Sequence, residues 1–347
     1  MKLSSSFAPS LRRELSTIAL ALLVAMLAGS LLILIYGQSP ARVYGLMLAR
    51  TLGDAYGLGQ LLFRATPLVF TGLAVALAFR AGLFNIGAEG QLAAGSMAAG
   101  MVGASLPAGT PALVAIPVCL LAAAAAGGVV GGIPGVLRAR FGAHEVIVTM
   151  MMNFIVAGTV LWLGKAHFFV AHTVHTAPIV AGARLPSLGL AGSAASVAFG
   201  LALLAAVGVH LLVTRTRWGF ELRALGQSPE AARAGGVAIG RRIAAALALS
   251  GALAGLVGSA TVMGYKGFHE EGLGSGAGFM GIAVALLGRG HAGGVVAAAL
   301  VLGFLAQGAL AASALVPKEI VDVLQAVIIL AVAAASATAA RARGAET

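Results

Sequence analysis

The sequence predicts an all-α fold: a polytopic integral membrane bundle of about ten transmembrane helices. Three observations support this class. Of the 347 residues, 60% are apolar and only 10% are charged, and the mean hydropathy is +1.00. A soluble domain is about 25% charged, so a chain this poor in charge needs lipid as its solvent. The 49 glycines are the third observation, because small residues let helices approach closely in a bilayer.

Apolar runs recur along the chain, and a helix needs about 20 apolar residues to cross the hydrocarbon. The predicted spans cover residues 15–36, 61–79, 87–106, 111–137, 146–164, 192–213, 243–264, 279–288, 291–312 and 319–339. The first run is too long for a cleaved signal peptide. The eighth is too short for a regular crossing, and we interpret it as a broken or tilted helix extended by the glycine-rich residues 272–278.

The Lys and Arg residues predict that both termini are cytoplasmic. With this orientation, fifteen basic residues lie inside and seven outside, as the positive-inside rule requires. If residues 279–288 did not cross fully, the last two spans would invert. With ten full crossings, we predict a single transmembrane domain, 1–347. It has cytoplasmic tails at 1–14 and 340–347 and a cytoplasmic loop at 214–242. Because the basic residues fall between apolar runs, the net charge of +11 does not indicate nucleic-acid binding.

Polar side chains at the start of the third span are candidates for function, because an ionisable group at membrane depth is costly. Asn85, Glu89 and Gln91 lie beside two glycines in the run 84–91. One interpretation is an interrupted helix lining a wet cavity, as in many transporters. The other is a cytoplasmic helix start, with Asn85 as the cap and Glu89 near the positive helix end.

The fifth span carries Glu145, Thr149 and Asn153 at intervals of four residues, so the three side chains share one helix face. This face either lines water or bonds a neighbouring helix. We assign no catalytic residue and no metal site, because no convergent Ser/His, paired Asp or metal-ligand cluster is present. GxxxG spacings such as Gly251/Gly255 predict close helix packing or a subunit contact.

The segment 214–242 contains the signature of a short helix. Ser228 can cap it, Pro229 suits the first position, Glu230 favours the positive end, and Gly235 can stop it. Such a helix could lie on anionic lipid or receive force from a peripheral motor. The chain has no GxxxxGK[ST] phosphate loop, so an ATPase would be another polypeptide.

Four segments together carry a resemblance to a known family. They are residues 65–95, residues 142–154 with HEVIVTMMMN, residues 221–241 with GQSPEAARAGG, and residues 278–294. They resemble the permease subunits of ATP-binding-cassette (ABC) importers of the branched-chain amino acid, ribose and nucleoside class. Within it, the chain is most similar to simple-sugar and purine-nucleoside permeases, over residues 60–335.

The resemblance implies a multi-pass subunit of the bacterial cytoplasmic (inner) membrane that moves a nucleoside or simple sugar by ATP-driven alternating access. A branched-chain amino acid is the alternative solute. An ion-coupled secondary transporter is the rival class, although most of the eleven acidic residues lie in loops or at span ends. The implied partners are a cytoplasmic ATPase that holds ATP and Mg, a second permease (an identical copy or a paralogue), and an extracellular solute-binding protein or lipoprotein. The chain itself would bind no cofactor.

The resemblance also assigns residues. The helix that couples the permease to the ATPase would contain Gly226, Pro229, Glu230, Ala231, Ala232 and Gly235. The translocation path would be lined or flanked by Asn85, Glu89, Gln91, Glu145, Thr149 and Asn153. The sequence departs from the family pattern at His144, where Asn is common, at Met280, where Asp is common, and at Ala292-Gly293, where a Pro is usual.

Overall fold

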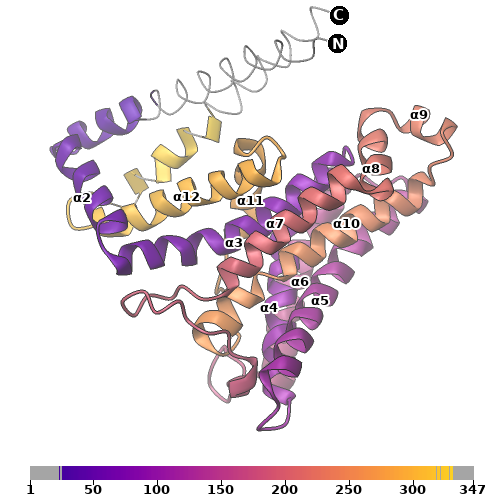
Figure 1. Ribbon diagram of the computed structural model, residues 1–347, viewed down its shortest axis with the longest axis horizontal. Helices are drawn as coiled ribbons and strands as arrows, with labels where there is room; N and C mark the ends of the chain where they lie inside the picture. Colours follow the sequence, from indigo (N-terminus) through magenta and orange to yellow (C-terminus); the bar gives the residue numbers. More distant parts are fainter. Residues whose placement is uncertain (1–22, 24–25, 318, 321, 328, 331–347) are drawn as a thin grey trace, which may run out of the picture. The chain divides into compact units, whose positions relative to one another are not determined.

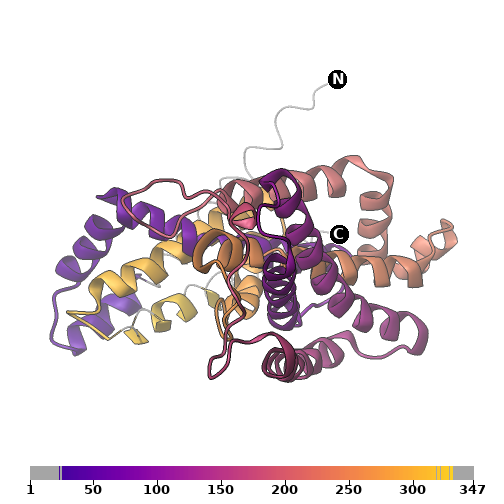
Figure 2. The ribbon, with the colours of Figure 1, turned by 90° about the horizontal axis from the view of Figure 1, so that it is seen from below.

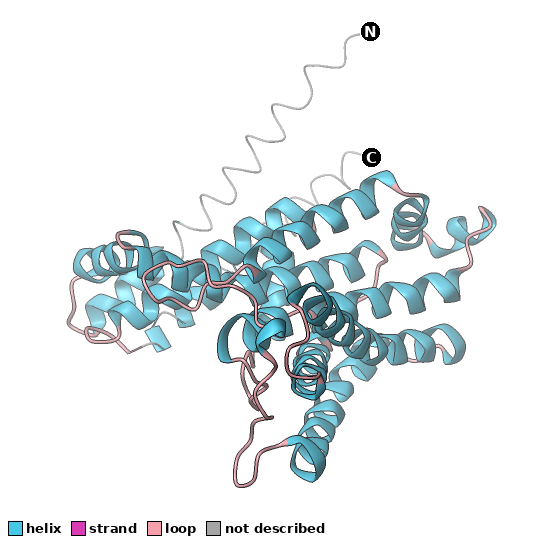
Figure 3. Ribbon diagram, turned by 60° about the horizontal axis from the view of Figure 1, so that its bottom comes forward, coloured by secondary structure: helices cyan, strands magenta, loops and turns pink. Residues whose placement is uncertain are grey.

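A computed structural model describes residues 23, 26–317, 319–320, 322–327 and 329–330. The chain forms two compact units: Met1–Gly57 with Phe304–Thr347, and Leu58–Gly303. The described residues form helices joined by loops, with three isolated β-bridges (Figure 3). The all-α prediction is therefore confirmed. The predicted tails 1–14 and 340–347 lie outside the described residues, and the cytoplasmic location of the termini stays a prediction.

Among the described residues, six helices are long and apolar enough to cross a membrane. They are α3 (Ala55–Arg80), α5 (Ala112–Phe141), Glu145–Phe168, α7 (Ala198–Arg215), Ile239–Lys266 and α12 (Ala292–Ala312). A helix at Met26–Ile35 and α2 (Pro40–Leu52) would count as a seventh span together, although they are bent by 116°. The described residues therefore do not confirm the count of ten.

Four predicted spans are not among these six. The first, 15–36, lies partly outside the described residues. The third is present as α4 (Ala88–Ser105), but its glycines and polar groups keep it below the apolarity of a span. The eighth is α11 (Ala277–Leu287), a short apolar helix. The tenth, 319–339, lies partly outside the described residues. Helix α2 is not among the predicted spans, because it falls between the first two, 15–36 and 61–79.

In the unit of Met1–Gly57 and Phe304–Thr347, the helix 26–35 contacts α2 through a tyrosine. The Tyr44 hydroxyl donates to the Met26 carbonyl at 3.1 Å, and the Ser30 hydroxyl donates to the same carbonyl at 2.7 Å. Gly308 of α12 packs against Met47 of α2. The rest of the Results concerns Leu58–Gly303.

Glycines set the packing in the larger unit. Helix α10 (Ile239–Gly255) lies against α5 and α4, and α4 also packs against α6 (Glu145–Leu163) (Figures 1 and 2). A Cβ on Gly127 or Gly131 would collide with the α10 backbone at Gly251 or Leu247. A Cβ on Gly255 would collide with the Ala123 carbonyl of α5. The predicted GxxxG pairs therefore serve packing within this chain.

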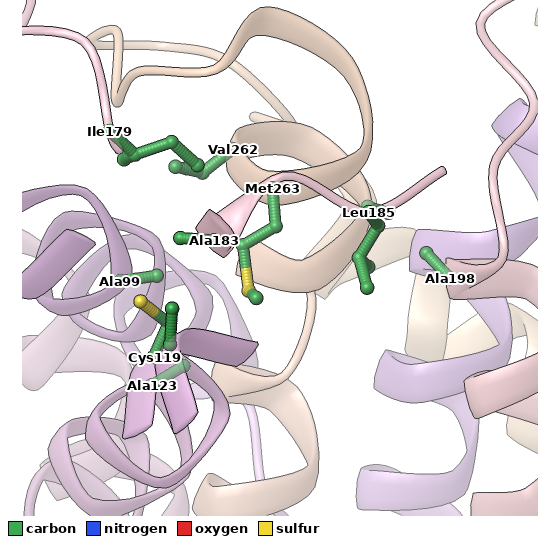
Figure 4. Close-up of a cluster of buried hydrophobic side chains, with 11 residues drawn as sticks. Ala99, Cys119, Ala123, Ile179, Ala183, Leu185, Ala198, Val262 and Met263 are labelled. Carbon is green, nitrogen blue, oxygen red and sulfur yellow. The ribbon is translucent and has the colours of Figure 1, made fainter. Parts of the chain in front are cut away.

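A buried apolar cluster joins the helix ends to the long loop of residues 169–197 (Figure 4). Ala99, Cys119 and Ala123 come from α4 and α5, and Met263 comes from the π-helix Ser259–Lys266 that follows α10. Ile179, Ala183 and Leu185 of the loop cover them. Backbone bonds fix the same contact: the Leu185 N–H donates to the Met263 carbonyl at 2.9 Å. In Figure 1 this loop lies at the opposite end of the unit from α9 (Pro229–Ala234).

Helix α11 is about half a span long, since eleven residues at 1.5 Å each cover about 16 Å of a hydrocarbon core of about 30 Å. The interpretation of this segment as short is confirmed. The expected helical extension is wrong for residues 272–276, because Gly272, Gly274 and Gly276 adopt positive φ angles of 81°, 86° and 88°, whereas Ala277 and Gly278 do belong to α11. These left-handed positions suit glycine and stop helix formation until Ala277.

Candidate functional site

The chain before α4 is extended and is held by a buried amide pair. Asn85 donates to Gln91 Oε1 at 2.9 Å, and Gln91 donates back to Asn85 Oδ1 at 3.1 Å. Asn85 also donates to Ser250 Oγ at 2.8 Å, and Ser250 donates to the Ala74 carbonyl at 2.6 Å. The network connects α3, α4 and α10. Asn85 and Gln91 are at most 1% exposed, so both are bonded inside the protein.

The interpretation of Asn85 as the helix cap is wrong. The N-cap position of α4 is Gly87, which has no side chain with which to cap the helix. Asn85 Oδ1 instead accepts the Gly87 N–H at 2.9 Å, which fixes the turn that precedes the helix.

Glu89 caps a different helix from its own. Its two carboxylate oxygens accept the N–H groups of Gly276 at 2.6 Å and Gly278 at 2.9 Å, at the start of α11. A carboxylate here neutralises the positive end of the helix dipole and makes charge-assisted hydrogen bonds. Thr71 of α3 also reaches this turn, donating to the Ala277 carbonyl at 2.8 Å. Glu89 thus joins the start of α4 to the start of the half-length α11.

The polar face of α6 bonds the neighbouring segment. Asn153 accepts the Gly90 N–H at 2.9 Å and donates to the Ile86 carbonyl at 3.0 Å. Thr149 accepts the Ile86 N–H at 3.3 Å. Of the two interpretations of this stripe, these bonds favour the one in which it satisfies the interrupted backbone before α4. Glu145 lies at the other end of the stripe, with its carboxylate 3.4 Å from Arg138 Nε.

A cavity of about 130 Å³ lies between α4, α6 and the connecting residues 269–275. Its lining consists of Glu89, Gly90, Leu92, Ala93, Asn153, Ala157, His269, Glu271, Gly272, Leu273 and Ser275. Two of the six predicted path residues, Glu89 and Asn153, therefore line the cavity. The other four are not among its lining residues.

His269 is a lining residue that sequence reasoning missed, because a polar residue in a connecting loop carries no signal. It is only 3% exposed, and its ring stacks on Phe169 with centroids 6.3 Å apart. Its Nε2 has no hydrogen-bond partner among the described residues, and Glu271 Oε2 lies 4.0 Å away. Burial lowers the pKa of His269 to about 4, although the nearby Glu270 opposes this change. The imidazole is therefore neutral at pH 7.

The short helix α9 has the bounds that the sequence predicts, Pro229–Ala234. Ser228 Oγ accepts the Ala231 N–H at 3.2 Å, and the helix ends at Gly235. Ala232 is buried, whereas Pro229, Glu230 and Ala231 are exposed. The helix therefore presents one face outward at the end of the unit (Figure 1).

Helix α8 (Arg217–Gln227), which was not predicted, seats α9 on the rest of the unit. Its buried Glu221 accepts hydrogen bonds from Arg217 at 3.1 Å and from Arg242 at the start of α10. At its other end, a Cβ on Gly226 would collide with the Arg80 carbonyl, so the two backbones are in direct contact.

Arg80 extends this contact towards the cavity. Its guanidinium donates to the Gly290 carbonyl at 3.2 and 3.0 Å, just after α11 ends at Leu287. The start of α11 is the end that Glu89 caps. A series of direct contacts therefore leads from α8 through Arg80 and α11 to the cavity.

These features define a class, a multi-pass membrane protein in which an interrupted helix and a half-length helix meet beside a polar cavity. The chain belongs to the family of the permease component of branched-chain amino acid transport systems, whose model matches residues 57–333. The expected resemblance to ABC importer permeases is confirmed. Members of this class are transport subunits and not enzymes.

Curated relatives share most of their length with this chain. It is 41% identical to the guanosine ABC transporter permease protein NupP of Bacillus subtilis over 92% of both chains. It is 35% identical to the glucose ABC transporter permease protein TsgB13 of Haloferax volcanii, over 90% of this chain and 86% of that one. It is 33% identical to the nucleoside ABC transporter permease protein NupB of Lactococcus lactis, over 90% of this chain and 89% of that one. No solved structure shows a significant match.

Proposed function

We propose that this permease moves a nucleoside or a simple sugar across the bacterial cytoplasmic membrane. The relatives named for guanosine, glucose and nucleosides support this solute class. The observation that carries the proposal is the charge of the cavity: the described residues that line it include Glu89 and Glu271, but neither Lys nor Arg. A branched-chain amino acid carries a carboxylate that would need a cationic or N–H partner there. A neutral polyhydroxy solute does not.

The α9 helix is the proposed site of coupling to a separate ATPase, which would bind ATP and Mg. Its exposed Pro229, Glu230 and Ala231 would form the contact, and Ala232 and Gly235 would hold the helix in place. Force on α9 would reach α11 through the contact of Gly226 with Arg80 and the bonds of Arg80 to Gly290. This route ends beside the cavity.

The proposed cycle is alternating access. A second permease, identical or paralogous, would complete the path, and an extracellular binding protein or lipoprotein would deliver the solute. Closing of the ATPase dimer would move α9, and α11 would shift against α4 at Glu89. Asn85, Gln91, Glu145 and Thr149 would flank the path and keep the backbone around it fixed.

The test of coupling is Ala231→Trp in the complete transporter, reconstituted in vesicles with its ATPase and binding protein. Because Ala231 is exposed on a capped helix, the variant should fold and insert normally. Uptake of labelled guanosine should fall at least tenfold while ATP hydrolysis continues. The control is Val207→Trp on the exposed face of α7, which should retain uptake. Normal uptake by the Ala231 variant would refute the assignment of α9.

A further inference from the structure

The unpartnered imidazole of His269 points to a binding site that the family match does not assign. We propose that His269 and Glu271 form a subsite that binds one ring of a neutral, hydrogen-bonding solute. This rests on the proposed function, and it adds the residues and the chemical class that they select. It concerns the cavity between α4, α6 and residues 269–275.

The cavity has the size of a ring. Its volume is about 130 Å³, well above the roughly 10–15 Å³ that one water molecule needs. Pockets that enclose whole drug-sized ligands are larger, about 300–1,000 Å³. The cavity therefore fits one pentose, hexose or heterocycle, and a nucleoside would place only one of its rings here.

The polar groups of the lining differ in what they can still bind. Glu89 already accepts two backbone N–H groups, and the Asn153 amide accepts from Gly90 and donates to Ile86. His269 Nε2 is buried without a hydrogen-bond partner among the described residues. Leaving such an atom unpaired costs free energy that a ligand would recover. His269 and Glu271 are therefore the lining residues with which a solute would form hydrogen bonds.

The position of the His269 ring is set before any solute binds. Its backbone N–H donates to Thr176 Oγ1 at 3.1 Å, and its carbonyl accepts the Thr176 N–H at 2.9 Å. Phe169 stacks on the ring, and Gly100 of α4 leaves room for the His269 Cβ, which a side chain there would meet at 2.6 Å. A rigid donor or acceptor binds with a smaller entropic cost than a mobile one.

The charges around the subsite select neutral solutes. Glu271 lies 4.0 Å from His269 Nε2, and Lys266 is paired with Glu270 at 2.9 Å. A phosphate or a free carboxylate would therefore meet Glu89 and Glu271, because no Lys or Arg is among the described residues that line the cavity. A hydroxyl or ring N–H can donate to Glu271 and bond His269. The subsite favours a sugar or purine edge over a nucleotide or an amino acid.

The test compares His269→Gln, whose side-chain amide can still hydrogen-bond into the cavity, with His269→Phe, which keeps a ring but loses the polar atom. Both are measured in the complete transporter with labelled guanosine and glucose, and both KM and kcat are recorded. For the transported solute, His269→Phe should raise KM at least tenfold. His269→Gln should stay within about threefold of wild type. His210→Phe, an exposed histidine on α7, is the matched control.

A direct binding measurement covers the case in which His269→Phe does not fold. The permease–ATPase complex, without binding protein, is titrated with guanosine, glucose, guanosine monophosphate and leucine by thermal shift. We expect guanosine or glucose to raise the unfolding temperature of the wild-type complex, and guanosine monophosphate and leucine to leave it unchanged. The increase should be lost in Glu271→Gln. Unchanged KM in His269→Phe, or equal stabilisation of wild type and Glu271→Gln, would overturn the subsite. Wild-type uptake of leucine with no uptake of guanosine or glucose would instead refute the proposed function.

Discussion

Replacing Glu89 by Gln tests whether a carboxylate on α4 holds the start of α11 in place. The two oxygens of Glu89 accept N–H groups at 2.6 and 2.9 Å from Gly276 and Gly278. Hydrogen bonds to a charged group contribute about 1.5–3 kcal/mol, against about 0.5–1.5 kcal/mol for neutral ones. The helix dipole adds about 0.3–1 kcal/mol. Gln keeps one acceptor and loses the charge, so the free energy that holds the start of α11 in place should fall by about 2 kcal/mol. The fraction of molecules in which this end of α11 is open should therefore rise roughly 30-fold.

The assay is hydrogen–deuterium exchange of the peptide that contains Gly276 and Gly278, in detergent or nanodiscs. These amides exchange through local opening of the start of α11, so their exchange should be about 30-fold faster in Glu89→Gln than in wild type. Glu230→Gln, which neutralises an exposed carboxylate of α9, is the control and should leave this peptide unchanged. Equal protection in wild type and Glu89→Gln would refute the idea that the carboxylate seats α11.

Three further predictions concern stability, each measured by thermal unfolding of the purified protein. Ser250→Ala removes the hydroxyl that joins Asn85 to the Ala74 carbonyl and should cost about 1–3 kcal/mol; an unchanged midpoint would contradict the network. Gly131→Ala should cost about 1–3 kcal/mol because its Cβ meets the α10 backbone, whereas Gly132→Ala should be tolerated, and equal midpoints would contradict the packing. The lowered pKa of His269 predicts that stability is full above pH 6.5 and is lost as pH falls towards 4, by roughly 3 kcal/mol. His269→Gln should abolish that part of the pH dependence, and identical pH profiles would contradict it.

Patterns that depend on neighbouring residues could be predicted from the sequence. The bounds of α9 follow from Ser228, Pro229 and Gly235, because capping and stopping act within one helical turn. The short length of α11 follows from its apolar run. The polar stripe of α6 follows from helical periodicity, which places its members on one face but does not say what that face contacts.

Contacts between distant segments could not be predicted. In the sequence, Glu89 is an ordinary acidic residue in a first helical turn, and its neighbours do not indicate that it caps a helix whose N-cap, Gly276, is 187 residues away. His269 lies in a loop of glycines and carboxylates, and only the fold buries it against Phe169. The number of spans could not be predicted for a related reason. Whether α4 crosses depends on packing against α5 and α10, and hydropathy does not measure this.

The central claim is that this chain is a passive gate moved by a separate ATPase. The most direct measurement is the accumulation of labelled guanosine or glucose in vesicles that contain the permease alone, with proton and sodium gradients imposed in turn. The same accumulation is then measured in vesicles that contain the complete transporter with ATP. We predict no uphill accumulation by the permease alone under either gradient, and ATP-dependent accumulation by the complete transporter. Sustained uphill accumulation by the lone chain would contradict the claim.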